Sequence, residues 1–86
     1  MADKAVQLSA HAEHALRERE LQLDWIVACV RSPEWREPDP TDPALERRFR
    51  SVPERGGRIL RVVCGENDAT ITVVTAFLDR KARRPA

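Results

Sequence analysis

The chain has 86 residues, of which 42% are hydrophobic and 34% are charged, and its formal net charge is +1. We expect one small domain over residues 1–86, burying only about 60% of the surface of the unfolded chain. The longest apolar stretch, residues 71–78, is far shorter than the roughly 20 residues that span a bilayer, which excludes a membrane-spanning helix. We expect no signal peptide, a cytoplasmic location, and buried thiols rather than a disulfide at Cys29 and Cys64.

Charge is divided unevenly along the chain. Residues 1–46 carry five basic and ten acidic side chains, whereas residues 47–86 carry ten basic and four acidic ones. Thirteen of the fifteen cations are arginine, whose guanidinium group suits phosphate. The second half therefore favours a phosphate-binding surface, although a genome rich in G and C would enrich arginine for any function.

The first half predicts two helices. We expect residues 1–8 to be a flexible tail in which residues 5–8 could add a short edge strand, and Ser9 fits the N-cap of a helix over residues 10–18. Ala12 and Ala15 lie on one face of that helix and favour close approach to a sheet. A second helix fits residues 22–31 and ends before Pro33. Residues 32–46 hold four of the six prolines without periodicity and predict a loop.

From residue 47 the hydrophobic period changes to 2, which predicts strands at residues 47–52, 58–65 and 70–79 joined by short turns. In the middle strand, one face is expected to meet the helices: Leu60, Val62 and Cys64. In the last strand the matching face is expected to be Ile71, Val73, Thr75 and Phe77, but the alternate set is nearly as apolar. Residues 80–86 are expected to form a basic tail. The fold class is therefore α+β, with two N-terminal helices packed on a three-stranded antiparallel meander sheet.

The stretch at residues 9–33 resembles the opening of a bacterial domain-of-unknown-function family, DUF4258. The matching positions there are Ser9, His11, Ala12, Leu16, Glu18, Arg19, Leu21 and Pro33. The closing hairpin is similar to that of the family at Arg58, Val62, Val63, Val74 and Thr75. Many members carry arginine in place of Ala15 and glycine in place of Glu20. The family layout is similar to toxins of the RelE/ParE and BrnT kind, so the resemblance implies a ribonuclease-like fold without implying that this copy cleaves RNA.

His11 is the main catalytic candidate, because a histidine near neutral pKa can move the 2′-OH proton in RNA cleavage. Arg19 and Arg61 would clamp the phosphate without a metal ion, and Thr75 could add a hydroxyl. The alternative is that His11 caps or packs at the helix start, and that His14 is a solvated surface residue. A metal site of both histidines with Cys64 or Asp79 lacks the ligand pair at each end that zinc patterns have. We expect no metal and no other cofactor.

Five further arginines are candidates for nucleic-acid binding through a basic sheet face: Arg47, Arg48, Arg50, Arg58 and Arg80. The alternative is that these charges solvate an edge strand and a tail and block aggregation. Trp35 could stack on a base or cover the open end of the core, and Trp25 is expected to pack at the edge of the second helix.

Two functions follow from these patterns. The first is an RNA-binding protein with metal-independent ribonuclease-like toxin activity. The second is a non-enzymatic module that pairs through its sheet edge, or through its acidic first half, with a partner such as an antitoxin-like protein. The sequence leaves the enzymatic activity, the oligomeric state and the buried face of the last strand open.

Overall fold

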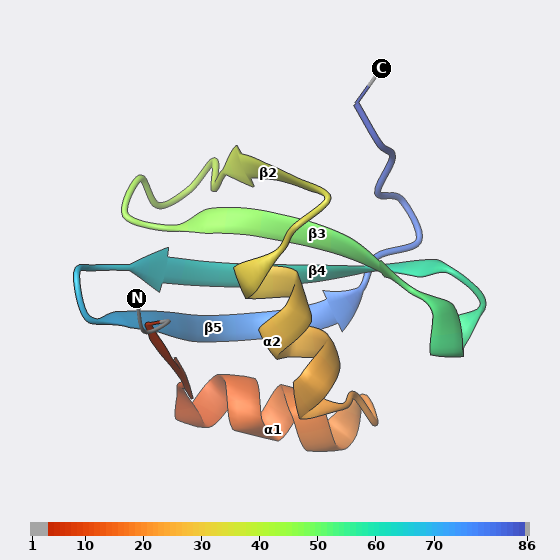
Figure 1. Cartoon of the computed structure of the whole chain (residues 1–86), viewed down its shortest axis with the longest axis horizontal. Helices are drawn as coiled ribbons and strands as arrows, with labels where there is room; N and C mark the ends of the chain where they lie inside the picture. The colour runs from red at the N-terminus through yellow and green to blue at the C-terminus, as the bar shows by residue number, and fades with distance from the viewer. Residues whose placement is uncertain (1–3, 86) are drawn as a thin grey trace.

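The computed structural model describes residues 4–85 and has two helices packed on one face of a five-stranded mixed sheet (Figure 1). The helices are α1 (Ala10–Glu18) and α2 (Leu23–Arg31). The strands are β1 (Ala5–Leu8), β2 (Trp35–Pro38), β3 (Glu46–Val52), β4 (Arg58–Glu66) and β5 (Thr70–Leu78), with a 3-10 turn, η1 (Pro53–Arg55), between β3 and β4. Neither described helix, at nine residues each, is long and apolar enough to cross a membrane.

The sheet has the order β1-β5-β4-β3-β2, so the expected three-stranded meander is wrong as a description of the whole sheet and forms only its centre. β1 is the short edge strand considered for residues 5–8 as an alternative to a tail, and it pairs in parallel with β5, Ala5 opposite Thr70. β2 comes from the expected loop and pairs antiparallel with β3. Pro38 ends this edge strand, where its missing N–H costs no ladder hydrogen bond. Of the two expected tails, residues 1–3 and residue 86 lie outside the described residues.

Helix α1 is fixed to β5 through its N-cap residue, Ser9, and its small side chains. The Ser9 hydroxyl accepts a hydrogen bond from the Ala12 N–H at 3.0 Å and donates one to the Val74 carbonyl at 3.1 Å. Ala12 and Ala15 are buried, as the sequence predicts, so the helix lies close to the strand. The predicted N-cap and the predicted bounds of this helix are confirmed.

The buried face of the central strands follows the prediction until a β-bulge in the pairing of β4 with β5. Leu60, Val62 and Cys64 are fully buried under the helices, as expected. The register shifts between Val63 and Cys64, leaving one extra residue in β5. The face toward the helices is therefore Ile71, Val73, Ala76 and Leu78. Thr75 and Phe77, expected on that face, lie on the opposite one, which we call the open face.

Candidate nucleic-acid interface

A row of aromatic and arginine side chains crosses the open face of the sheet. The strand register places four residues opposite one another in succession: Trp35, Phe49, Arg61 and Phe77. With strands about 4.8 Å apart, this row extends about 14 Å across β2, β3, β4 and β5. The rings of Trp35 and Phe49 stack at 4.7 Å between centroids with an interplanar angle of 7°. We call these four residues the aromatic–arginine row.

At one end of the row, two guanidinium groups lie near the Phe77 ring. The Cζ atom of Arg61 is 4.4 Å from the ring centroid, and the Cζ atom of Arg19 is 5.8 Å from it. Arg61 pairs with Asp79, Nε to Oδ2 at 3.4 Å, and Arg19 donates from Nη1 to the Ala76 carbonyl at 2.9 Å. These partners orient both groups, while each guanidinium keeps further N–H donors for a ligand.

A cavity of about 490 Å³ adjoins this end of the row, where β5 ends and β4 begins. Its lining residues are Arg19, Leu21, Arg55, Arg58, Phe77 and Leu78, and we call it the arginine cavity. The end of α1, the turn η1 and the first residue of β4 each bring one arginine into it. Three guanidinium groups and no carboxylate line the cavity, so its electrostatic potential favours an anionic ligand.

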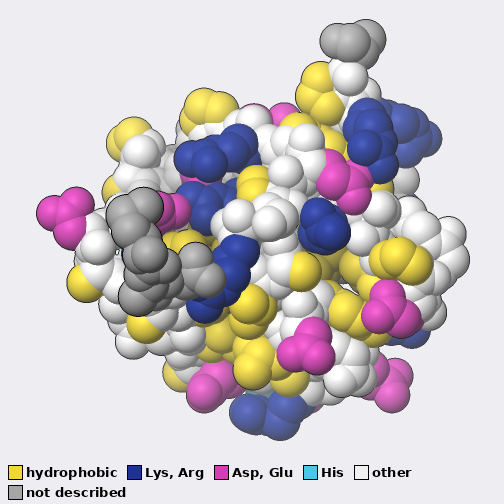
Figure 2. All heavy atoms as spheres, viewed as in Figure 1, with side chains coloured by type: hydrophobic (Ala, Val, Ile, Leu, Met, Phe, Trp, Pro, Cys, Tyr) yellow, Lys and Arg dark blue, Asp and Glu magenta, His cyan; other side chains and the backbone are white. Residues whose placement is uncertain are grey.

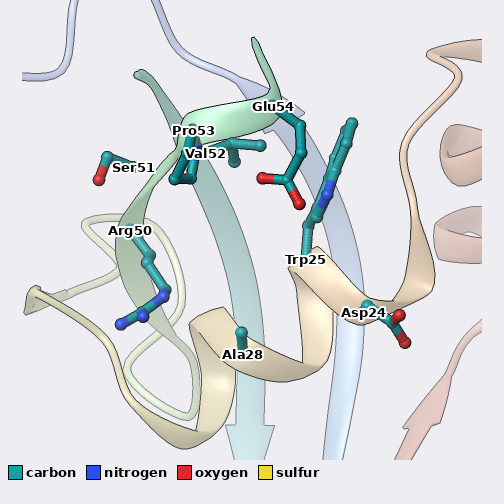
Figure 3. A pocket seen from close by; sticks show the side chains of 8 residues that line it. All are labelled: Asp24, Trp25, Ala28, Arg50, Ser51, Val52, Pro53 and Glu54. Carbon is teal, nitrogen blue, oxygen red and sulfur yellow. The ribbon is translucent and has the colours of Figure 1, made fainter. Parts of the chain in front are cut away.

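A second, smaller cavity lies between α2 and the end of β3. It has a volume of about 220 Å³, and its lining residues are Asp24, Trp25, Ala28, Arg50, Ser51, Val52, Pro53 and Glu54 (Figure 3). The Cζ atom of Arg55, which lines the arginine cavity, is 5.7 Å from the centroid of the Trp25 ring. The Trp25–Arg55 pair therefore stands between the two cavities. We call the smaller one the tryptophan cavity.

The structure thus brings Arg19, Arg58 and Arg61, three of the arginines singled out from the sequence, to one end of the sheet. His11 lies elsewhere: it is exposed on the first turn of α1, and its ring makes no hydrogen bond or ion pair with the other residues in 4–85. Arg19 is eight positions further along the chain, which corresponds to about 12 Å along the helix axis. His14 is also exposed and lies 3.7 Å from Glu18, Nε2 to Oε1.

Two of the remaining predicted arginines interact with carboxylates. Arg48 is only 3% exposed and binds the Val30 carbonyl, Glu46 and Glu66 at 2.7, 2.6 and 2.5 Å. Arg47 pairs with Glu37 and Asp39 at 3.9 and 3.7 Å. These contacts assign both side chains to stabilising the sheet.

Arg50 and Arg80 lie outside the arginine cavity. Arg50 donates to the Ser32 carbonyl at 2.7 Å and lines the tryptophan cavity. Arg80 is exposed in the turn after β5. On the helix side of the molecule, Lys and Arg side chains occur as separate groups mixed with acidic ones, without one continuous basic patch (Figure 2).

Sequence reasoning missed Phe77, Arg55 and the alignment of the row. Phe77 was expected on the helix side, because both faces of β5 are apolar in sequence and nothing marks the bulge. Arg55 sits in the turn before Gly56 and Gly57, which both have positive φ. Its position three residues before Arg58 was the available signal, since a tight turn folds such neighbours toward the same end of a sheet.

Both cysteines are buried thiols, as the sequence predicts. Burial raises the pKa of Cys29 to about 12 and that of Cys64 to about 11. A thiol with so high a pKa holds almost no thiolate at neutral pH, so neither group is a ready nucleophile. Residues 4–85 contain no cluster of three or more His, Cys, Asp or Glu side chains arranged to hold a metal ion.

Comparison with known proteins identifies one family. A family model described as Domain of unknown function (DUF4258) matches residues 8–78, from the end of β1 to the end of β5. The family predicted from the sequence is therefore confirmed. No curated protein and no solved structure matches the chain.

Proposed function

The chain belongs to the family described as Domain of unknown function (DUF4258), and from its geometry we propose that it binds single-stranded RNA on the open face of the sheet, with the aromatic–arginine row and the arginine cavity as the binding surface. The observation that carries this proposal is the position of Arg61 and Arg19 near the Phe77 ring, at 4.4 and 5.8 Å. The same two side chains belong to a surface that also offers Arg55 and Arg58.

Trp35, Arg61 and Phe77 of the row are half-buried and can meet unstacked bases, whereas Phe49 is only 3% exposed and supports the Trp35 ring from below. Proteins that bind single strands use aromatic rings and guanidinium planes as platforms on which bases stack, with cations beside them for the phosphates. The row supplies the Trp35 ring at one end and, two strand spacings or about 10 Å further along, the Arg61 guanidinium. Arg58, exposed at the start of β4, is placed to meet a phosphate.

A single strand fits this surface better than a duplex does. A duplex presents its phosphates on the outside and hides its bases, so aromatic side chains in a row would have nothing to stack on. The concave arginine cavity, with one aromatic ring in its wall, suits one flexible nucleotide at a time.

Binding is better supported than cleavage. A general acid or base must come within about 3 Å of the proton that it transfers, and the residues that line the arginine cavity include no histidine and no carboxylate. His11 would act only on a strand that continues from the cavity along α1 toward the helix start. Ribonuclease and toxin activity therefore remain a hypothesis that depends on His11, separate from RNA binding.

A protein partner at the edge of the sheet is the second candidate, and one observation favours β1 for it. The two edge strands of the described sheet differ: β2 carries Arg36, Glu37 and Pro38, which discourage pairing, whereas β1 has the uncharged sequence AVQL. A partner strand would add to the outer edge of β1 by main-chain hydrogen bonds. This surface is distinct from the open face.

The proposal is tested by fluorescence anisotropy with a labelled single-stranded RNA of eight nucleotides at low and physiological salt. We expect the double variant Arg19→Gln/Arg58→Gln to weaken binding at least tenfold. Arg80→Gln removes a comparable exposed charge outside the cavity and should change Kd by less than twofold. An absence of RNA binding at low salt, or equal losses in the two variants, would refute the proposed surface.

A further inference from the structure

The tryptophan cavity combines a flat apolar slot with a carboxylate that has no partner. Figure 3 shows the Trp25 ring on one side, Val52 and Pro53 on the other, and the Glu54 carboxylate between them. Glu54 makes no hydrogen bond or ion pair with any other residue in 4–85. Asp24, although it borders the cavity, points away from it on the far side of α2 in the same view. The slot therefore holds one acceptor group beside an aromatic wall.

The size of the slot fits one planar ring system. Its volume of about 220 Å³ is below the roughly 300–1,000 Å³ typical of sites for drug-sized ligands. Trp25, Pro53, Val52 and Ala28 supply its apolar walls, so a flat ligand would stack on the Trp25 ring with the exposed Glu54 side chain beside it. A base is the planar group that a bound RNA strand can supply, and Trp25 gives the strongest stacking surface for it.

The carboxylate then discriminates among bases. An ionised carboxylate only accepts hydrogen bonds, so it pairs best with two adjacent N–H donors. Guanine alone presents such a pair, N1–H and the N2 amino group. In adenine and cytosine a ring-nitrogen acceptor lies next to the amino donor, and in uracil two carbonyl oxygens flank the single N–H. Each of these acceptors would face the negative charge of Glu54, which disfavours those bases.

The slot lies on the helix side of the sheet, and the Trp25–Arg55 pair links it to the arginine cavity. Arg55 lies over the Trp25 ring, with Cζ 5.7 Å from its centroid, and also lines the arginine cavity. A nucleotide with its base against Trp25 would therefore have its phosphate near Arg55 and Arg58. Glu54 and Arg55 are consecutive in η1, so one turn supplies the base acceptor and the phosphate cation.

We propose that the tryptophan cavity is a guanine-binding subsite, with Trp25 stacking on the base and the Glu54 carboxylate accepting from its N1–H and N2 amino groups. This inference rests on the proposed RNA binding and adds base specificity to it. If the protein bound RNA with equal affinity for every base, the proposed RNA surface would stand and the guanine subsite would be refuted.

The test compares labelled U-only oligoribonucleotides with otherwise identical ones carrying a single central G, A or C, using the full chain. We expect the G-containing strand to bind at least fivefold more tightly than the A-containing one. Glu54→Gln should weaken binding of the G strand about tenfold, as expected for hydrogen bonds to a charged acceptor, and leave the U strand unchanged or slightly tighter. Asp24→Asn removes the same charge from a side chain that points away, and should keep the preference for G.

Four outcomes overturn the inference. Equal affinity for all four strands, or an unchanged preference for G in Glu54→Gln, would remove the subsite while RNA binding stands. If Asp24→Asn also lost the preference for G, that preference would depend on overall negative charge and not on Glu54. No binding of any strand at low salt would refute the proposed function and the subsite together.

Discussion

The Arg61 guanidinium lies 4.4 Å from the centroid of the Phe77 ring, and a β-bulge makes this contact possible. Without the extra residue in β5, Phe77 would alternate onto the helix side, and Arg61 would face no ring. The bulge thus converts a core position into a position on the open face. Bulges recur where a strand must re-aim a side chain at a functional surface.

Replacing Phe77 tests whether its ring serves RNA binding or only packing. We expect Phe77→Leu to weaken binding of single-stranded RNA about fivefold. The substitution removes the aromatic ring that orients Arg61 and Arg19, and it removes stacking between that ring and a base. Phe77→Tyr keeps the ring and should bind within twofold of the unchanged protein. Urea denaturation of both variants separates a binding effect from unfolding, and equal affinity of the Leu variant would exclude the ring from the interface.

The salt dependence of binding reports the number of phosphate contacts. For single strands, each neutralised phosphate contributes about 0.7 to the slope of log K against log salt. Arg58→Gln should therefore reduce that slope by about 0.7, because Arg58 lines the arginine cavity and is exposed. Arg80→Gln is the matched control, with no change in slope expected. If the slope falls in the Arg80 variant instead, the phosphates are bound by the C-terminal tail and not by the arginine cavity.

A variant of His11 distinguishes RNA binding from RNA cleavage. Because His11 lies about 12 Å from Arg19 along α1, we expect His11→Ala to leave RNA affinity within twofold. The measurement is anisotropy at low salt, together with gel analysis of the RNA after incubation with each protein. Cleavage that disappears in the variant would support the ribonuclease hypothesis, and a large loss of affinity would show that bound RNA reaches the start of the helix.

The sequence predicted elements whose signals are local. Ser9 and the two buried alanines indicate α1 through signals that lie in the helix or directly before it. The period of 2 after residue 47 indicates the three central strands. For residues 5–8 the sequence left a tail or a short edge strand open, because the partner in β5 lies 65 residues away, Ala5 opposite Thr70, and four residues carry little periodicity. β2 was assigned to a loop, because Pro38 and its charges are typical of loops as well as of edge strands.

The sequence predicted some of the residues of the site but not how they are arranged. Arg19, Arg58 and Arg61 were singled out because arginine suits phosphate, and the structure places them at one end of the sheet. Trp35 was weighed as a stacking residue without any indication that it lies in line with Phe77. That alignment depends on the register of three strand pairs and on the bulge. Register is set by packing over the whole sheet and leaves no mark in a strand that is apolar on both faces.

The two cysteines should resist thiol reagents in the folded protein. Burial raises the pKa of Cys29 to about 12 and that of Cys64 to about 11, and both are fully buried. We expect neither thiol to react with a chromogenic disulfide reagent near pH 8, and both to react once the chain is denatured. A stoichiometric reaction of the native protein would mean that α2 opens from the sheet on the timescale of the assay.

Acid should destabilise the fold through Glu66. Hydrogen bonds from Lys4 and Arg48, at 2.7 and 2.5 Å, lower the pKa of Glu66 from 4.5 to about 2. A carboxylate with a lowered pKa in the folded state contributes stability above its unfolded value, and that stability is lost as the pH falls from about 4.5 to about 2. The loss should be on the order of 1 kcal/mol, since solvent screens a side chain that is one-third exposed.

Glu66→Gln should lower the free energy of unfolding by a similar amount near pH 7 and remove this contribution to the acid dependence, measured by urea denaturation at a series of pH values. Arg48 would keep Glu46 and the Val30 carbonyl as partners, which limits the damage from losing one contact. Glu54→Gln, which removes a carboxylate without a partner, should retain the acid dependence of the unchanged protein. An acid dependence that persists in Glu66→Gln would assign the effect to another carboxylate, with Glu34 next to examine because hydrogen bonds from Ser51 lower its pKa.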